Sequence, residues 1–290
     1  MFGKPPSIAH FLFRALFSIV FVLQMAVAGA AWTWVGFWLR YVLMAAIVLA
    51  TVIGGVRTLR RKVDTLVIVT WRERIDLLLA VGLFALFATG LPQLAGRRQY
   101  DGIAVELAFP LHGERYVPVH GGQGVSVNMH QQVKAQSYAI DVVQLGALSM
   151  RAAGILPAEL SRYVIYGRSV HAPCAGEVIA ARGDLPDQVP PTGDTVNLAG
   201  NHVVLFCKDV SVLLAHLKPG SLKVAVGDQV ALDAVLGDVG NSGNTSEPHL
   251  HIHAVRGRVS DLPALVETAE PVPMLFPPGR FLTRNDVISN

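Results

Sequence analysis

Charged side chains are scarce in this sequence. Asp, Glu, Lys and Arg make up only 16% of its 290 residues, against about 25% in typical soluble domains. Hydrophobic residues make up 52%, and the mean hydropathy is +0.44. This shortage of charge excludes an ordinary soluble protein and predicts segments that cross a membrane.

The long uncharged stretches lie near the N-terminus. Residues 15–39, 41–56 and 77–96 contain no Asp, Glu, Lys or Arg. A helix needs about 20 predominantly apolar residues to cross a bilayer. The sequence therefore predicts that residues 1–98 form a membrane anchor. Its transmembrane helices are expected at 12–32, 36–56 and 77–96. An alternative reading makes residues 1–30 a cleaved signal peptide, because "AGA" at 28–30 fits a small-residue cleavage site.

Basic residues are concentrated in the same region. Residues 1–98 hold 11 Lys and Arg against 3 Asp and Glu, whereas residues 99–290 hold 13 against 18. The basic excess therefore lies outside the folded domain and argues against nucleic-acid binding. Six cations flank the connection between the second and third spans: Arg57, Arg60, Arg61, Lys62, Arg72 and Arg74. The positive-inside rule then predicts a multi-pass protein of the bacterial cytoplasmic (inner) membrane, with residues 99–290 exported.

The exported part has the pattern of a β domain. Short apolar stretches rich in Val and Ile lie between clusters of Gly, Pro, Asn and Asp. They are "YAIDVVQL", "GEVIAA", "HVVLFC", "VSVLLAHL" and "DAVLGDVG". Gly227 and Asp228 predict a tight turn between two strands, and residues 182–201 predict a surface loop. We expect a mainly β fold, with a compact antiparallel sheet domain preceded by three transmembrane α-helices.

Cysteine is almost absent. The only two, Cys174 and Cys207, both fall in the exported part and in stretches expected to form neighbouring strands. An even pair in an oxidising compartment is compatible with a disulfide. Two buried free thiols are the alternative.

Histidine is present in an unusual row. The stretch "GNSGNTSEPHLHIHAV", residues 240–255, places His249, His251 and His253 at alternate positions. Such side chains share one face of a strand and lie about 6.5 Å apart, so two neighbours can serve one metal ion. A hydrolytic zinc site keeps three protein ligands and leaves the fourth position for water. The spacing alone leaves open whether His249 or His251 is a ligand.

Partners for this row lie upstream. Asp141 stands inside an apolar strand, where an acidic side chain suggests a nearby cation. His130 precedes that strand, and His216 ends the strand "VLLAHL", where burying an imidazole without a partner is costly. The remaining histidines are interpreted as structural: His10, His112, His120, His171 and His202.

Several of these stretches occur together in a known order. "QSYAIDVV", "GNHVVL", "LLAHLKPGS", "VAVGDQV" and "VGNSGNTSEPHLHIHA" resemble the lysostaphin-type (LytM-like) zinc metallopeptidases, which cut peptide bonds in bacterial peptidoglycan. The resemblance covers residues 118–256 and leaves out the membrane region. It implies a compact antiparallel β fold with a groove and one Zn²⁺ per chain. The implied metal ligands are His130, Asp141 and His251, and the implied catalytic histidines are His216 and His249.

The first motif departs from the commonest form of that family, in which the histidine and aspartate lie closer together. Here His130 and Asp141 are 11 positions apart, so His120 is the alternative to His130. His253 is expected to orient a ligand or to pack, because a fourth protein ligand would close the site to water.

These residues predict amide hydrolysis. Zinc lowers the pKa of a bound water to about 7, and an imidazole with a pKa near 6.5 can transfer protons at neutral pH. We expect a membrane-anchored zinc metalloendopeptidase that hydrolyses stem or cross-bridge peptides of peptidoglycan, with the lipid bilayer as its other partner and no nucleic acid.

Two other classes of function stay open. A catalytically silent, wall-binding regulator of another hydrolase would share this fold and would be expected to lack a ligand. A carrier-like β domain is suggested by "VAVGDQVALDAVLGDVG", but it would need a modifiable lysine in a turn, and the turns of this stretch contain none.

Overall fold

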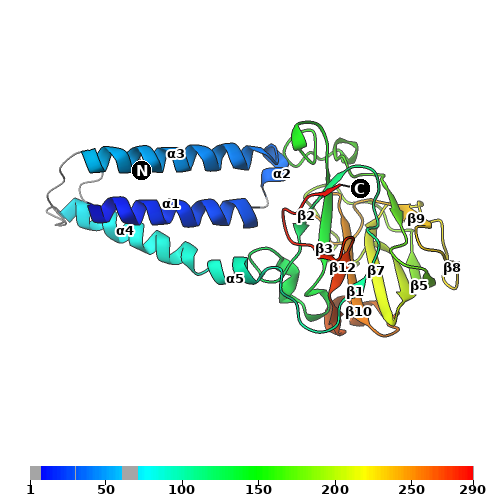
Figure 1. Cartoon of the computed structure of the whole chain (residues 1–290). Coiled ribbons are helices and arrows are strands. Elements are labelled where there is room, and N and C mark those ends of the chain that lie inside the picture. The colour runs from blue at the N-terminus through cyan, green and yellow to red at the C-terminus, as the bar shows by residue number, and fades with distance from the viewer. Residues whose placement is uncertain (1–7, 30, 61–70, 290) are drawn as a thin grey trace.

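The computed structural model describes residues 8–29, 31–60 and 71–289. Three long helices run side by side and meet a β domain at one end (Figure 1). The helices are α1 (Ile8–Ala28), α3 (Leu39–Arg60) and α4 (Trp71–Ala88), with the short α2 (Trp32–Val35) and α5 (Leu91–Gly96) at the end next to the β domain. The chain thus has the predicted order of helices first and β structure second.

All three long helices are apolar enough to cross a membrane, judged by length and composition. The segments Phe11–Ala28, Leu39–Arg57 and Arg74–Gly96 have mean hydropathies of 2.1, 2.1 and 2.0. Their ends differ from the predicted spans. The helix α1 stops at Ala28, where the Trp32 indole donates to the Met25 carbonyl at 2.6 Å and helps satisfy the last turn.

The third predicted span is divided into two helices. It consists of α4 and α5, and a proline occupies the first turn of α5, a position where its missing N–H costs nothing. Two of the six predicted cytoplasmic cations, Arg61 and Lys62, lie outside the described residues.

The β domain is built on one large sheet. Its strands are ordered β14-β2-β3-β10-β7-β6-β5-β8, with β11 pairing β10 off this path. Their bounds are β2 (Arg115–His120), β3 (Ile140–Leu145), β5 (Gly176–Arg182), β6 (Asn201–Cys207), β7 (Val210–Leu217), β8 (Gln229–Val230), β10 (Leu250–Arg256), β11 (Pro271–Val272) and β14 (Ile288–Ser289). Every pairing within it is antiparallel, which confirms the predicted fold class.

Two smaller sheets flank it. One pairs β4 (Ser169–His171) with β9 (Val235–Asp238), and the other joins β1 (Val105–Glu106), β12 (Met274–Phe276) and β13 (Arg280–Phe281). The β1–β12 pair is parallel. The predicted turn at Gly227 and Asp228 is present, but only the short β8 follows it and no strand precedes it among the described residues 222–226.

The central strands divide their side chains between two faces. Leu250, Ile252 and Ala254 of β10 enter the main apolar core, together with Ile140 and Val142 of β3. Side chains alternate along a strand, so the intervening residues of both strands face the opposite side of the sheet. This opposite face carries the histidine row and Asp141.

The two cysteines form a disulfide. Cys174 and Cys207 are bridged with their Cα atoms 6.4 Å apart, and both belong to the main core. The bridge closes a loop with a sequence separation of 33, which corresponds to about 3–4 kcal/mol of stability in the chain-entropy treatment.

We expect no reactive thiol in the denatured, unreduced protein and two after reduction. The double variant Cys174→Ala/Cys207→Ala should lose about 3–4 kcal/mol of unfolding free energy, because its denatured chain is no longer constrained. Thiol counting and denaturant unfolding measure the two results. Two reactive thiols before reduction would contradict the bridge.

The apolar helices are docked on the β domain. The Asn285 side-chain amide donates to the Val27 and Gly29 carbonyls at 3.1 and 2.9 Å. Trp32 and Phe37, from the connection between α1 and α3, join Val117 and Leu145 in a buried apolar cluster. This connection, residues 29–38, therefore lies on the same side of any membrane that the helices cross as the β domain does.

Candidate metal and catalytic site

The register of β3 and β10 brings two predicted ligands together. His251 is paired with Asp141 across these strands, and its Nδ1 lies 2.8 Å from Asp141 Oδ1. His130, on the single turn η1 (Met129–Gln132), places its Nε2 2.8 Å from Asp141 Oδ2. One ligand atom from each of the three residues lies within 4.8 Å of the others.

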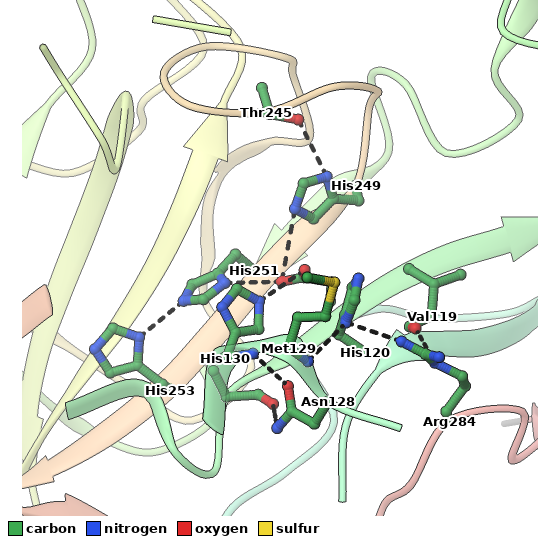
Figure 2. Close-up of polar contacts among 12 residues, drawn as sticks. Val119, His120, Asn128, Met129, His130, Thr245, His249, His251, His253 and Arg284 are labelled. Atoms are coloured by element: carbon green, nitrogen blue, oxygen red, sulfur yellow. Dashed lines mark hydrogen bonds and ion pairs between the residues drawn. The ribbon is translucent and has the colours of Figure 1, made fainter. Parts of the chain in front are cut away.

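The loop before β3 explains how His130 reaches Asp141 despite the long spacing. Asn128 is fully buried, and its side chain accepts from the His130 N–H at 3.2 Å while donating to the carbonyls of Gly122 and Ala139 at 3.2 and 3.1 Å. Figure 2 shows this contact between Asn128 and His130. The 11-residue interval is thus an ordered loop, held to the start of β3.

His120, the alternative to His130, has other partners. Its Nδ1 accepts from the Met129 N–H at 3.2 Å and lies 3.1 Å from Nη2 of Arg284, as Figure 2 shows. Burial lowers the pKa of His120 to about 4. The structure therefore brings His130 to Asp141, while His120 contacts Met129 and Arg284.

A chain of hydrogen bonds fixes the proton positions on His251. The Leu265 carbonyl can only accept, so His253 donates to it from Nε2 at 3.0 Å. Burial lowers the pKa of His253 to about 3, so this ring is neutral and its Nδ1 accepts from His251 Nε2 at 2.8 Å. If His251 is neutral, its only ring proton is on Nε2, and the Nδ1 that faces the Asp141 carboxylate carries none. Two acceptors this close repel each other unless a cation lies between them.

His130 also has a polar neighbour. Gln136 donates its amide to the Val266 carbonyl at 2.7 Å, and its side chain helps raise the pKa of His130. His130 Nε2 faces Asp141 and is the nitrogen available to a cation. Burial opposes a charge on this ring, but Asp141 outweighs it and raises the pKa of His130, so a metal entering here would displace a proton.

Asp141 is an anion in this setting. Burial would raise its pKa, but the surrounding histidines hold the pKa of this carboxyl well below its ordinary value. One carboxylate and two imidazole nitrogens are a donor set that Zn²⁺ prefers. Metal-bound histidines commonly donate their other N–H to an acceptor that fixes the ring, as His251 does to His253 here. The residues present thus fit a zinc ion.

We expect His253→Ala and Gln136→Ala to weaken zinc binding by about 10- to 100-fold, because each removes the group that orients a ligand. The three ligands stay in place, so both variants should still take up one zinc at saturating metal. Titration against a competing chelator measures the affinity. His202→Ala is a matched control, since His202 is also buried and bonds a carbonyl, that of Gly200 at 2.8 Å, outside this group. Wild-type affinity in both variants would contradict the orienting role.

The two predicted catalytic histidines lie beside the ligands. The His249 and His216 ring centroids are 4.8 Å apart, and that of His216 is 5.8 Å from that of His251. His249 Nδ1 faces the Glu247 carbonyl at 2.8 Å, and His216 Nδ1 faces the Ser242 carbonyl at 2.9 Å. Carbonyls only accept, so both rings donate from Nδ1 and keep Nε2 for chemistry. His249 Nε2 lies 3.6 Å from Asp141 Oδ1.

His216 reaches the site through an irregular backbone. Its φ is +64°, and the pairing of β6 with β7 shifts register beside it. A left-handed conformation costs a residue other than glycine about 1–3 kcal/mol and persists where the surroundings enforce it. Here the His216 N–H donates to Ala199 and its carbonyl accepts from Gly240. Burial lowers the pKa of His216 well below its ordinary value, so the ring is a neutral base.

The glycine-rich turn before β10 packs its backbone closely against that of Gly200. A Cβ on Gly200 would lie 2.2 Å from the Ser242 carbonyl oxygen, and one on Gly243 would lie 2.4 Å from the Gly200 nitrogen. Both glycines also have positive φ. The contact places the Ser242 carbonyl, which orients His216.

A second His/Asp group was missed by sequence reasoning. One ligand atom each from His112, His171 and Asp233 lies within 4.8 Å of the others. The two imidazole rings are stacked, 4.1 Å apart and 14° from parallel. A metal lies in the plane of each ring that binds it, so parallel stacked rings are poorly arranged to share one ion.

Comparison with known proteins finds a family match over part of the β domain. Residues 163–261 match the model of Peptidase family M23. The β domain thus carries a peptidase family M23 region, which includes His216, His249 and His251 and leaves His130 and Asp141 upstream of it. No curated protein matches the chain.

Solved structures are similar at low identity. A zinc-containing peptidase from Vibrio cholerae is 23% identical over 32% of this chain and 24% of its own, with a TM-score of 0.25. The catalytic domain of the antimicrobial peptidase lysostaphin from Staphylococcus simulans is 19% identical over 52% of this chain and 84% of its own, with a TM-score of 0.30. A chain of the SpoIIIAH and SpoIIQ complex is 17% identical over 52% and 92%, with a TM-score of 0.34. This chain thus spans about a quarter of the Vibrio cholerae protein.

Proposed function

We propose that this chain is a membrane-anchored zinc metalloendopeptidase that hydrolyses peptide bonds in the stem or cross-bridge peptides of peptidoglycan. The observation that carries the proposal is the convergence of two imidazole nitrogens, His130 Nε2 and His251 Nδ1, on the Asp141 carboxylate, each at 2.8 Å. The match to Peptidase family M23 supports peptide bonds as the substrate.

The proposed chemistry divides the residues into two groups. His130, Asp141 and His251 hold the zinc, which when bound lowers the pKa of a coordinated water and polarises a carbonyl. His216 and His249 present Nε2 beside this group because carbonyls fix their Nδ1 atoms. Each ring has an unprotonated Nε2 that can take a proton from the attacking water, and a ring protonated there can then donate to the developing oxyanion or the leaving amine.

The alternatives have less support. A silent wall-binding regulator would be expected to lack one of these five side chains, and all five are present. A carrier-like domain would need a modifiable lysine in the stretch from Val224 to Gly240, where none occurs.

Purified full-length protein in detergent should release defined peptides from peptidoglycan of known cross-link chemistry. A zinc chelator should stop the release and added zinc should restore it, with the products identified by mass. The full chain is needed because Trp32 and Phe37 of the anchor pack against Val117 and Leu145 of the β domain. Release at the wild-type rate by a mock preparation from cells that lack the protein would show that a contaminating hydrolase is responsible.

The proposed topology predicts the behaviour of reporter fusions. A reporter that functions only outside the cytoplasm should be active when fused after Gly96, and inactive when fused at Asp64, which lies outside the described residues. The reason is the cluster of cations between the second and third helices. A cytoplasmic reporter at the same two points is the control and should give the reverse pattern. Activity of the first reporter only at Asp64 would overturn the orientation and make wall cleavage untenable.

A further inference from the structure

The connection between α1 and α3 contacts the β domain close to His249. The Arg151 N–H donates to the Thr33 carbonyl at 2.8 Å, and the Arg151 guanidinium carbon lies 3.8 Å from the centre of the Trp34 ring. That distance is typical of a cation–π contact. Arg151 is therefore the point at which this connection, which belongs to the membrane anchor, meets a charged group of the β domain.

Arg151 also forms a buried ion pair with Glu247. Its Nη1 lies 2.6 Å from Oε1 of Glu247, and the two side chains are only 6% and 11% exposed. Burial lowers the pKa of Arg151 to about 10, so the guanidinium stays charged at neutral pH. A buried ion pair is little screened, and it holds its geometry because either partner alone would be an uncompensated charge.

Glu247 is the residue that orients His249. Its backbone carbonyl accepts from His249 Nδ1 at 2.8 Å and from the Thr245 hydroxyl at 2.7 Å. Arg151 thus fixes the side chain of Glu247, and the backbone carbonyl of Glu247 fixes the imidazole of His249.

We propose that Arg151 and Glu247 are positioning residues that link the membrane anchor to His249. Trp34 and Thr33 hold Arg151, Arg151 holds Glu247, and the Glu247 carbonyl sets the His249 ring. The inference rests on the proposed role of His249 in proton transfer. The contact of Trp34 and Thr33 with Arg151 would then act on His249, which a flexible tether between the helices and the β domain could not do.

The test uses full-length protein and a pair of matched variants. Trp34→Leu keeps apolar bulk and removes the aromatic face, whereas Trp34→Phe keeps a face for Arg151. Trp34→Leu should lower kcat by about 10- to 100-fold, the loss expected from a misplacement of about 1 Å, with KM and zinc content close to wild type. Trp34→Phe should retain most of the activity.

Two further variants keep the test decisive. Glu247→Gln removes the ion pair without changing side-chain shape and should lower kcat in the same way. Asn285→Gly is the control, because it removes the two hydrogen bonds to the end of α1 while a glycine accepts the positive φ of Asn285. It loosens the anchor elsewhere and should keep wild-type kcat.

A spectroscopic measurement separates this inference from the proposed function. The ring ¹⁵N signals of His249, assigned by their loss in His249→Ala, report its tautomer and hydrogen bonding. They should shift in Trp34→Leu and Glu247→Gln, and stay in place in Asn285→Gly, whether or not the protein is active. If wild type hydrolyses nothing, the proposed function fails and these signals alone decide the link. Unchanged His249 signals in both Trp34→Leu and Glu247→Gln would overturn it.

Discussion

His251→Ala should lose both its bound zinc and its peptidase activity. Metal content should fall from near one per chain to near zero, because two protein ligands do not hold zinc as three do. Asp141→Asn should behave alike, since the amide removes the negative charge that His130 and His251 both face. Metal analysis beside a turnover assay measures both quantities, and His202→Ala serves as the control that keeps both.

The opposite pattern has a definite meaning. If His249→Ala loses zinc while His251→Ala keeps it, the roles of the two residues along the strand are reversed. If His130→Ala, Asp141→Asn and His251→Ala all keep zinc, the histidine row is structural and the peptidase proposal fails. The structure favours His251 as ligand because its Nδ1 meets Asp141 at 2.8 Å, whereas His249 Nε2 lies 3.6 Å away.

Much of the fold could be predicted from local pattern. Val- and Ile-rich stretches became the central strands because alternate residues such as Leu250 and Ile252 enter the core. Three apolar helices followed from the uncharged runs. Their ends could not be placed, since the end of α1 depends on Trp32 donating to the Met25 carbonyl, a contact that periodicity does not reveal.

The candidate site could be predicted only in part. Residue type and spacing singled out the histidine row and Asp141, but the choice of His251 depends on its register with Asp141 across two strands. The tautomer of each ring depends on a distant carbonyl, such as that of Leu265 for His253. Gln136 gave no signal in the sequence, because its effect arises only when the fold brings it against His130.

The contact between the anchor and the β domain was not predicted. The sequence indicated a membrane anchor followed by an exported β domain, and nothing in residues 29–38 indicated more than a connection between spans. In the structure Trp32 and Phe37 are buried against Val117 and Leu145. Such a long-range contact depends on tertiary packing, which composition and hydropathy do not encode.

Replacing His249 or His216 should abolish most of the activity without removing the zinc. Replacing either with alanine leaves His130, Asp141 and His251 in place, so zinc content should stay near one per chain. Activity should nevertheless fall by about 10²–10³-fold, because each ring supplies a proton-transfer or oxyanion-stabilising group. Zinc analysis and turnover on the same preparations test both statements together.

The double variant His216→Ala/His249→Ala shows whether the two rings act as a unit. Their Nδ1 atoms are fixed by two different carbonyls, those of Ser242 and Glu247, so each ring is placed independently of the other. If both must act on the same water and carbonyl, losing the second ring should cost far less than losing the first, as with other residues that work together. If the loss of activity in the double variant equals the product of the two single losses, the rings act in separate steps. Wild-type turnover in either single variant would remove that histidine from the mechanism, even with its zinc retained.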